Sequence, residues 1–535
     1  MDQFLNNFHI RDFSKIGKSN IFSSNAMVAS SHPIASSIGI DVLKNGGNAV
    51  DAALAMSAVL CVAEPHMTGV GGDCFAMLSI DGSTKIKALN GSGKSSQNAS
   101  SKKLLDEGFK SITAEMPEAV TIPGSVAAWS LLHKEHGHMP WKDIFKPAIE
   151  FAKLGVIIHE RVAFDWEKNV SKLSKDIDTA KLFLKDGNEY KVKDKFINLG
   201  LSDVFETISH DGQDGFYKDW IAKDICQKLL SVGGNQSLND FKKASAEWVV
   251  PITGTYRNIK LHECPPNGQG IVAIIILAII EKFNISSLSK ADYMHIFCEA
   301  SKIGYFLRDQ YLSDFHNNKL SIEEFLTSKL IDRYASMIDL KQAKYFTKSD
   351  FPDHADTIYL SVRDKKGMTI SFINSLFDAF GSGITAPKSG ILLHCRGRGF
   401  NLIEGHPNEL KPNKRPLHTI IPAMLSQNDK LLGSFGVMGG QYQASGHAYV
   451  LSQIIDFGLN PQQAINYPRL FPNNDTLDIE SSFDKDLIDE LTSRGHKINY
   501  PSDIIGGGQM ILIDNDNKVL IGASDWRKDG LAIGY

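Results

Sequence analysis

An acid–threonine pair, Asp356-Thr357, followed by two strand-like runs is the feature that most constrains the fold of this chain. Residues 357–362 (TIYLSV) alternate between apolar and polar side chains, a period of two that is typical of a half-buried strand. Residues 364–367 (DKKG) suit a tight turn, and residues 368–373 (MTISFI) suit the returning strand. Thr357 is therefore expected at the exposed mouth of a β-hairpin.

The composition is that of an ordinary globular protein, with 42% hydrophobic and 22% charged residues among 535. A net charge of −4 lacks the basic excess of nucleic-acid-binding domains, so no nucleic-acid partner is expected. The six cysteines form no CxxC pair, which argues against a zinc ribbon or a redox motif and favours reduced structural thiols. No metal site and no cofactor are predicted.

Nothing in the sequence predicts a membrane or an export signal. The first residues, MDQFLNN, lack the basic and apolar regions of a signal peptide. The longest apolar run, 271–280, is too short to span a bilayer and is expected to form a buried helix. A cytoplasmic protein is therefore expected.

The order of patterned segments predicts an α+β fold with antiparallel sheets, because strand patterns lie toward both ends, helical patterns lie between them, and βαβ alternation is missing. The expected elements are an irregular lead-in at 1–26, helices at 33–44 and 48–62, strands at 74–79 and 85–89, mostly helices over 125–350, an exposed linker at 340–356, a helix near 446–458 and a strand pair at 510–513 and 519–523.

Seven short motifs accompany the hairpin. In chain order they are EPHMTGVGGD (64–73), PGSVAAW (123–129), CPPNGQG (264–270), FGSG (380–383), PNKRPLHT (412–419), GVMGG (436–440) and GASD (522–525). This series resembles the gamma-glutamyltranspeptidase family of N-terminal nucleophile hydrolases. The resemblance implies a four-layer α/β/β/α sandwich, formed as one composite domain by a large part, 27–356, and a small part, 357–535.

The resemblance also gives Thr357 a chemical role. A hydroxyl is a poor nucleophile without an adjacent base, and an N-terminal threonine has its own α-amine, whose pKa is near 8. That amine is free only after a cut between Asp356 and Thr357, which the same hydroxyl performs in the family. The mature protein is then expected to cleave a small-molecule amide through a Thr357 acyl-enzyme. Hydrolysis is favoured over transfer, because no acceptor site is evident.

Further site residues follow from the family motifs. Gly439 and Gly440 are expected to supply the oxyanion donors, because glycine lets backbone N–H groups approach closely. Ser375 on the returning strand matches a hydroxyl that orients the nucleophile. His418 and Thr419 occupy the position of the family's serine pair, beside the oxyanion and the substrate.

The chain departs from the family where a gamma-glutamyl group is held. Ser92 stands where an arginine is expected, Gly399 where an aspartate is expected, and Phe377 where an asparagine is expected. Losing these contacts should abolish gamma-glutamyl selectivity. The chain is thus similar to a divergent branch that includes oxamate amidohydrolase and cephalosporin-acylase-like members.

Five basic residues in or near these motifs suggest a replacement anion clamp for a carboxylate of different geometry. They are Lys94, His394, Arg396, Arg398 and Arg415. Arg396 and Arg398 are the main candidates for binding an acidic substrate.

The oligomeric state remains open, and a homodimer is one option. Two alternative functions also remain open at this point. A catalytically inactive relative would keep the fold and act as a binding protein. A nucleotide-binding protein is the other alternative, because residues 88–95 (ALNGSGKS) fit a loosened phosphate-loop pattern with Lys94 as its lysine.

Overall fold

The structure is a computed structural model that describes residues 8–9, 11–14, 16–314, 322–344 and 357–535. Asp356 and most of the predicted linker at 340–356 lie outside the described residues.

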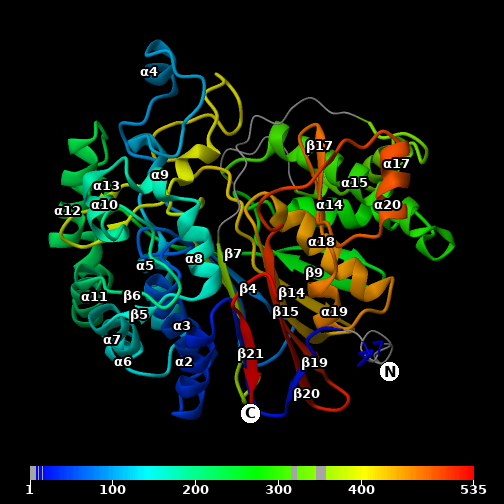
Figure 1. The fold of residues 1–535 in the computed structure, drawn as a ribbon, viewed down its shortest axis with the longest axis horizontal. Coiled ribbons are helices and arrows are strands. Elements are labelled where there is room, and N and C mark those ends of the chain that lie inside the picture. Colours follow the sequence, from blue (N-terminus) through cyan, green and yellow to red (C-terminus); the bar gives the residue numbers. More distant parts are fainter. Residues whose placement is uncertain (1–7, 10, 15, 315–321, 345–356) are drawn as a thin grey trace.

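Two seven-stranded antiparallel sheets form the centre of the molecule (Figure 1). The first sheet has the order β1 (Ile21–Ser23), β20 (Val519–Ser524), β19 (Gly507–Asp514), β15 (Lys430–Met438), β14 (Ala423–Gln427), β9 (Ile259–Glu263) and β8 (Ile252–Tyr256). The second has the order β21 (Leu531–Gly534), β2 (Met27–Ser30), β10 (Ile358–Arg363), β11 (Thr369–Ser375), β3 (Asp73–Ser79), β4 (Lys87–Gly91) and β7 (Glu247–Val249).

The two sheets pack face to face through side chains that alternate along their strands. Phe75, Tyr359 and Met424 belong to one fully buried cluster that both sheets share. Each such side chain contributes roughly 1.5–3 kcal/mol when it is removed from water. Gly436 of β15 lies against the Tyr359 ring, where an added Cβ would come within 2.3 Å of a ring carbon. Glycine at this position therefore lets the sheets approach closely.

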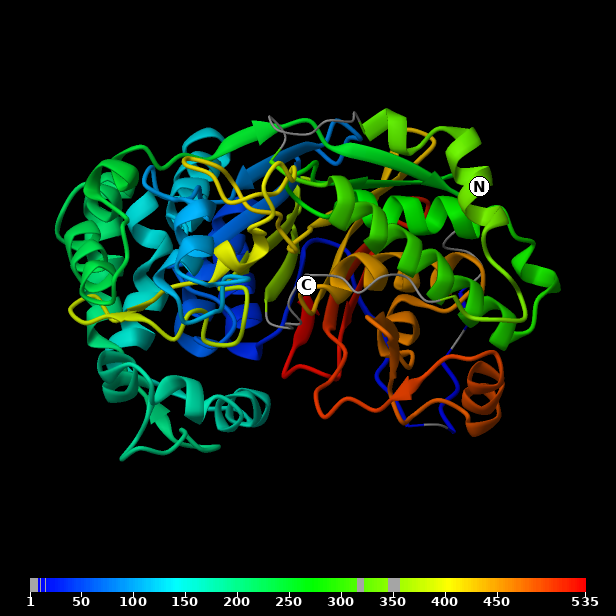
Figure 2. The same cartoon turned by 90° about the horizontal axis from the view of Figure 1, so that it is seen from above.

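Helices cover the outer faces of both sheets, as two views at right angles show (Figures 1 and 2). The helices against or near the second sheet are α2 (Pro33–Lys44), α3 (Ala49–Ala63), α5 (Ser125–His136), α6 (Trp141–Ile144), α7 (Lys146–Leu154), α8 (Glu160–Glu167), α9 (Val170–Leu173), α10 (Ile177–Phe183), α11 (Leu199–Tyr217), α12 (Trp220–Ser231) and α13 (Leu238–Lys242). Those on the side of the first sheet are α14 (Gly270–Ile280), α15 (Lys290–Tyr311), α16 (Ile322–Phe325), α17 (Ser328–Ser336), α18 (Tyr442–Ile455), α19 (Pro461–Asn466) and α20 (Lys485–Ser493). Outside these groups, α4 (Ser101–Asp106) lies on a loop.

Several short strands lie outside the two large sheets. They are β5 (Val156–Ile157) with β6 (Lys195–Phe196), β12 (Thr385–Ala386) with β13 (Ile391–Leu392), and β16 (Leu470–Asn473) with β17 (Thr476–Ile479) and β18 (Ile498–Asn499). The predicted mixture of helices and antiparallel sheets is confirmed.

Several predicted elements are found with shifted ends. The helix expected at 48–62 is α3, where Asn48 forms a capping box with Asp51. The apolar run at 271–280 is the buried helix α14, and no helix in the described part of the chain is long and apolar enough to cross a bilayer.

One expectation, about an irregular segment, needs correction. The stretch 1–26, expected to be irregular, contains β1, which pairs with β20 near the end of the chain. Its partner is distant in the sequence, and local patterns do not reveal such pairing. The stretch 125–350 is mostly helical as expected, and it also contains the short strands β5 to β9.

The predicted hairpin is present as β10 and β11, and its register aligns three residues of interest. Ile358 pairs with Asn374, so one further step along the ladder brings Thr357 opposite Ser375. Ser375 in turn pairs with Asp73 at the start of β3. Thr357 is not at an exposed mouth, however, because only 1% of its surface is accessible. The expected exposure was wrong, because side chains such as Gln443 of α18 lie against this end of the hairpin.

Candidate active site

The Thr357 hydroxyl lies between two side-chain partners from different elements. Its Oγ1 is 3.2 Å from the Ser375 Oγ at the end of β11, and the Gln443 Nε2 donates to it over 3.4 Å. Gln443 is fixed in turn, because its Oε1 accepts from the Ile421 amide at 3.1 Å. The hydroxyl is therefore held at a defined position by one strand neighbour and one residue of α18.

Gly439 and Gly440 form the turn from β15 into α18, directly before the helix that carries Gln443. Both have positive φ angles, +119° and +54°, which favour glycine. Neither amide donates a hydrogen bond to another described residue. The beginning of α18 also places the positive end of a helix dipole here. The amides of this turn are therefore suited to binding a negatively charged group.

Arg396 is fully buried on the other side of Ser375, in a short 3-10 helix at Arg396–Gly399. Its guanidinium donates to the Thr419 Oγ1 at 2.9 Å and to the Ser375 Oγ at 3.3 Å. The group also stacks on the Phe377 ring, with its Cζ 3.9 Å from the ring centroid. Burial lowers the pKa of Arg396 to about 9, so the side chain is still a cation at neutral pH.

No carboxylate lies within 4.0 Å of Arg396 among the described residues, whereas the neighbouring arginines are paired. Arg398 forms an ion pair with Asp378, and Arg415 forms one with Glu247. The Arg396 Nε has no hydrogen-bond partner in the described structure. A buried cation without a contacting anion is costly unless a ligand supplies one.

Asp73 anchors the wall of the site behind Ser375. One carboxylate oxygen accepts from the His418 Nε2 at 3.1 Å, and the other accepts from the Gly93 and Gly124 amides at 3.0 and 3.1 Å. Burial alone would raise the pKa of Asp73. The nearby His394, the His418 hydrogen bond and the Arg396 cation outweigh that effect and lower the pKa to about 2.

His418 is a buried neutral donor. Burial, with a smaller effect from the nearby Arg396, lowers the pKa of His418 to about 3. Its ring therefore donates to the ionised Asp73 without carrying a charge of its own. The buried charge of Asp73 is balanced through space by Arg396.

This buried histidine predicts a loss of stability in acid. Below pH 6.5 the unfolded chain protonates His418, but the native chain does not do so until about pH 3, so stability falls as the pH drops through this window. At pH 5 the free energy of unfolding should be lower by about 2 kcal/mol from this residue alone. Urea unfolding at pH 7.5 and 5.0 measures the change. His418→Gln, which cannot titrate, should show a smaller pH effect than the wild type. An equal effect would contradict the assignment.

Comparison with known proteins decides the family. Residues 35–535 match the family profile described as Gamma-glutamyltranspeptidase. The chain belongs to the gamma-glutamyltranspeptidase family. It is 32% identical to the glutathione hydrolase-like YwrD proenzyme of Bacillus subtilis, over 96% of this chain and 99% of the relative. It is 28% identical to the oxamate amidohydrolase proenzyme of Klebsiella pneumoniae, with the same coverage.

A solved structure extends the likeness to three dimensions. The crystal structure of cephalosporin acylase from Bacillus halodurans matches 99% of both chains with a TM-score of 0.92 and 33% sequence identity. The predicted resemblance is thereby confirmed, and the fold is that of a gamma-glutamyltranspeptidase family member over essentially its whole length.

Two of the residues predicted to bind substrate contact groups other than the Thr357 hydroxyl. Ser92, at the family's arginine position, is buried, and its Oγ accepts from the Asn267 Nδ2 at 3.0 Å. Arg398 contacts Asp378. Thr419, by contrast, contacts Arg396 directly. Of the five residues suggested as an anion clamp, Arg396 is therefore the one whose hydrogen bonds lead to Thr357.

Two residues that sequence reasoning missed are Gln443 and Gln269. The Gln269 Nε2 donates to the Thr419 O at 2.8 Å and to the Gly440 O at 3.1 Å, so it ties the two loops together. Gln269 belongs to the CPPNGQG motif, so the sequence did contain a signal that could have identified it as a site residue. Gln443 carries no such signal, because a glutamine on a helix is most often a solvated residue.

A cleft of about 490 Å³ opens beside the glycine turn. Its lining includes Arg161 and Lys172, which precede position 357 in the sequence, and Gly439 and Tyr442, which follow it. This volume is within the range of small-molecule sites. A substrate amide could therefore reach Gly439 from this cleft.

The nucleotide-binding alternative does not fit the local structure. The Gly93 amide, which would face a phosphate, donates to the Asp73 carboxylate instead. The next helix, α4, begins only at Ser101, so no helix N-terminus follows Lys94 directly. A phosphate at this loop would meet a carboxylate rather than a cradle of free N–H groups.

Proposed function

We propose that this chain is a self-cleaving threonine amidohydrolase of the gamma-glutamyltranspeptidase family. Cleavage between Asp356 and Thr357 frees the Thr357 α-amine, which then serves as the base for the Thr357 hydroxyl. The observation that carries the proposal is the position of that hydroxyl, buried at the start of β10 and hydrogen-bonded by Ser375 and Gln443. Asp356 itself lies outside the described residues.

The proposed reaction has four steps. The Thr357 Oγ1 gives its proton to the α-amine and attacks the substrate carbonyl. The resulting oxyanion is stabilised by the amides of Gly439 and Gly440 at the start of α18. The amine leaves with a proton, and an acyl ester on Thr357 remains. A water molecule then hydrolyses the ester, with the α-amine again acting as base.

The proposed substrates are small amides whose acyl part carries a carboxylate close to the scissile carbonyl. Arg396 supports this class, because it is a buried cation whose Ser375 contact also touches the Thr357 hydroxyl. Ordinary gamma-glutamyl peptides are disfavoured by Ser92, Gly399 and Phe377 at the three family anchor positions. The relative named oxamate amidohydrolase makes small acidic amides the first compounds to screen.

The two proposed fragments, 27–356 and 357–535, would remain associated as one composite domain. Each large sheet contains strands from before and from after position 357, so separating the fragments would break both cores. This arrangement supports assignment of the layers to the four-layer α/β/β/α sandwich of N-terminal nucleophile hydrolases. The proenzyme names of the relatives support the proposed maturation.

Intact mass and N-terminal sequencing of the purified protein test the proposal. We expect fragments of roughly 40 and 20 kDa, the shares of the 59.0 kDa chain that residues 1–356 and 357–535 hold. The smaller fragment should begin Thr-Ile-Tyr-Leu. A single uncut chain that does not mature on incubation would favour the alternative of an inactive family member that acts as a binding protein.

A further inference from the structure

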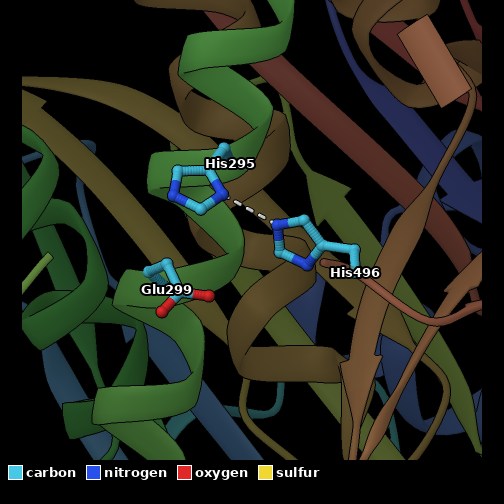
Figure 3. A group of neighbouring side chains, drawn as sticks. All are labelled: His295, Glu299 and His496. Atoms are coloured by element: carbon cyan, nitrogen blue, oxygen red, sulfur yellow. Dashed lines mark hydrogen bonds between the residues drawn. The ribbon is translucent and has the colours of Figure 1, made fainter. Parts of the chain in front are cut away.

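A group of three buried side chains, separate from the Thr357 site, brings together ligand types that bind metal ions (Figure 3). His295 and Glu299 lie one turn apart on α15, so both face the same side of that helix. His496 reaches them from the loop between α20 and β18. One ligand atom from each residue lies within 4.8 Å of the others, and all three residues are at most 4% exposed.

The hydrogen bonds around His295 fix which nitrogen is available. Its Nε2 lies 2.7 Å from the Asp339 backbone oxygen, which can only accept, so Nε2 carries the hydrogen. The Nδ1 of His295 therefore presents its lone pair, and it faces the His496 Nε2 at 2.8 Å. A ligating histidine that donates its other N–H to a backbone carbonyl is the usual arrangement in metal sites.

The Glu299 carboxylate is also oriented by neighbours. One oxygen accepts from the Lys302 Nζ at 2.6 Å, and the other accepts from the Lys344 amide at 3.1 Å. These bonds hold the carboxylate beside the two rings. Lys302 also opposes a metal ion, because its ammonium would repel a second cation at the same carboxylate.

We propose that His295, Glu299 and His496 form a binding site for a divalent transition-metal ion of the Zn²⁺ class. Two imidazoles and one carboxylate, with water as a fourth ligand, are a set that Zn²⁺ accepts in proteins. Binding moves the His496 proton from Nε2 to Nδ1, so both lone pairs face the ion and the rings release no net proton. The rings also part slightly, because two nitrogens at about 2.0–2.1 Å from one tetrahedral ion lie about 3.3 Å apart.

The site would join segments on either side of the proposed cut. His295 and Glu299 precede position 357, and His496 follows it. If the cleavage proposed above occurs, the ion clamps the large fragment to the small one. Metal binding itself needs no cleavage, so the two proposals can fail separately. No metal motif was predicted from the sequence, because two ligands on one helix are completed only by a residue far along the chain.

Titration of chelator-treated protein with Co²⁺, followed by displacement with Zn²⁺, tests the proposal. We expect one Co²⁺ per chain with the visible absorption of a four-coordinate site, in the wild type and in uncut Thr357→Ala alike. His496→Ala should weaken binding by more than roughly 100-fold, since losing a ligand costs more than losing a partner of a ligand. Lys302→Met should strengthen binding, because it removes the opposing charge.

Two control variants exclude adventitious sites. His136→Gln alters a partly buried histidine beside Glu135, and Cys226→Ser alters a partly exposed thiol. Both should bind Co²⁺ like the wild type. Because His496→Ala can also disturb folding, Glu299→Gln provides a second variant: Zn²⁺ should raise the thermal midpoint of the wild type but not that of Glu299→Gln. Stoichiometric binding that survives in His496→Ala and Glu299→Gln, or no binding by the wild type, would overturn the proposal.

Discussion

Thr357→Ala is expected to remain a single chain and to lose amide hydrolysis by roughly 10⁵-fold or more, as happens when a catalytic nucleophile is removed. The substitution removes the attacking Oγ1, which is needed both for self-cleavage and for the acyl-enzyme. Alanine keeps only the Cβ methyl between Ser375 and Gln443, and this small truncation should leave the fold intact. Intact mass, together with turnover of a small acidic amide, measures both effects.

Thr357→Ser is the matched control, because it keeps a hydroxyl and, after cleavage, an α-amine. This variant should cut itself and retain measurable turnover. Ser375→Ala should cut more slowly than the wild type, because the hydroxyl loses its partner at 3.2 Å. Cleavage or full activity in Thr357→Ala would show that another residue is the nucleophile.

Arg396→Leu is expected to lower kcat/KM for acidic amides by roughly 100-fold, the cost of losing a charge-assisted contact in a closed site. Turnover of a neutral amide of similar size should fall much less. The ratio of kcat/KM for the acidic amide to kcat/KM for the neutral amide isolates carboxylate recognition, because any effect through the Arg396–Ser375 contact acts on both substrates. Steady-state kinetics on a matched acidic and neutral pair provides the measurement.

Two control variants test the assignment further. Arg398→Leu should change this ratio little, because Arg398 is already paired with Asp378. Arg396→Lys should recover part of the selectivity, since lysine keeps the charge but loses the planar fork of donors. An unchanged KM for the acidic amide in Arg396→Leu would exclude Arg396 from substrate binding.

The hairpin shows how much of the candidate site was predictable. The alternation after Thr357 and the DKKG turn set the register, and the register alone brings Ser375 opposite Thr357. Local pattern was sufficient there because strand pairing across a short turn depends on nearby residues. The same reasoning gave the wrong exposure for Thr357, which segments distant in the sequence bury.

The anion clamp shows the opposite case. Arg396, Arg398 and Arg415 are indistinguishable as basic residues in a sequence, and only their partners separate them. Asp378 and Glu247 pair with two of them, whereas Arg396 donates to the hydroxyl groups of Thr419 and Ser375. The contribution of Gln443 was likewise invisible, because its contact with Thr357 joins a helix to a strand of the other sheet.

The amino-acid sequence by itself determined the family, the hairpin and the order of the motifs, because these depend on residue types at fixed spacings along the chain. The tertiary structure decided which cation lies beside Thr357, how Asp73 balances it, and which helix residue completes the hydroxyl's contacts. It also brought His496 to His295 and Glu299. Such contacts depend on how two sheets pack and on which side chains lose water together, and spacing along the chain does not encode either.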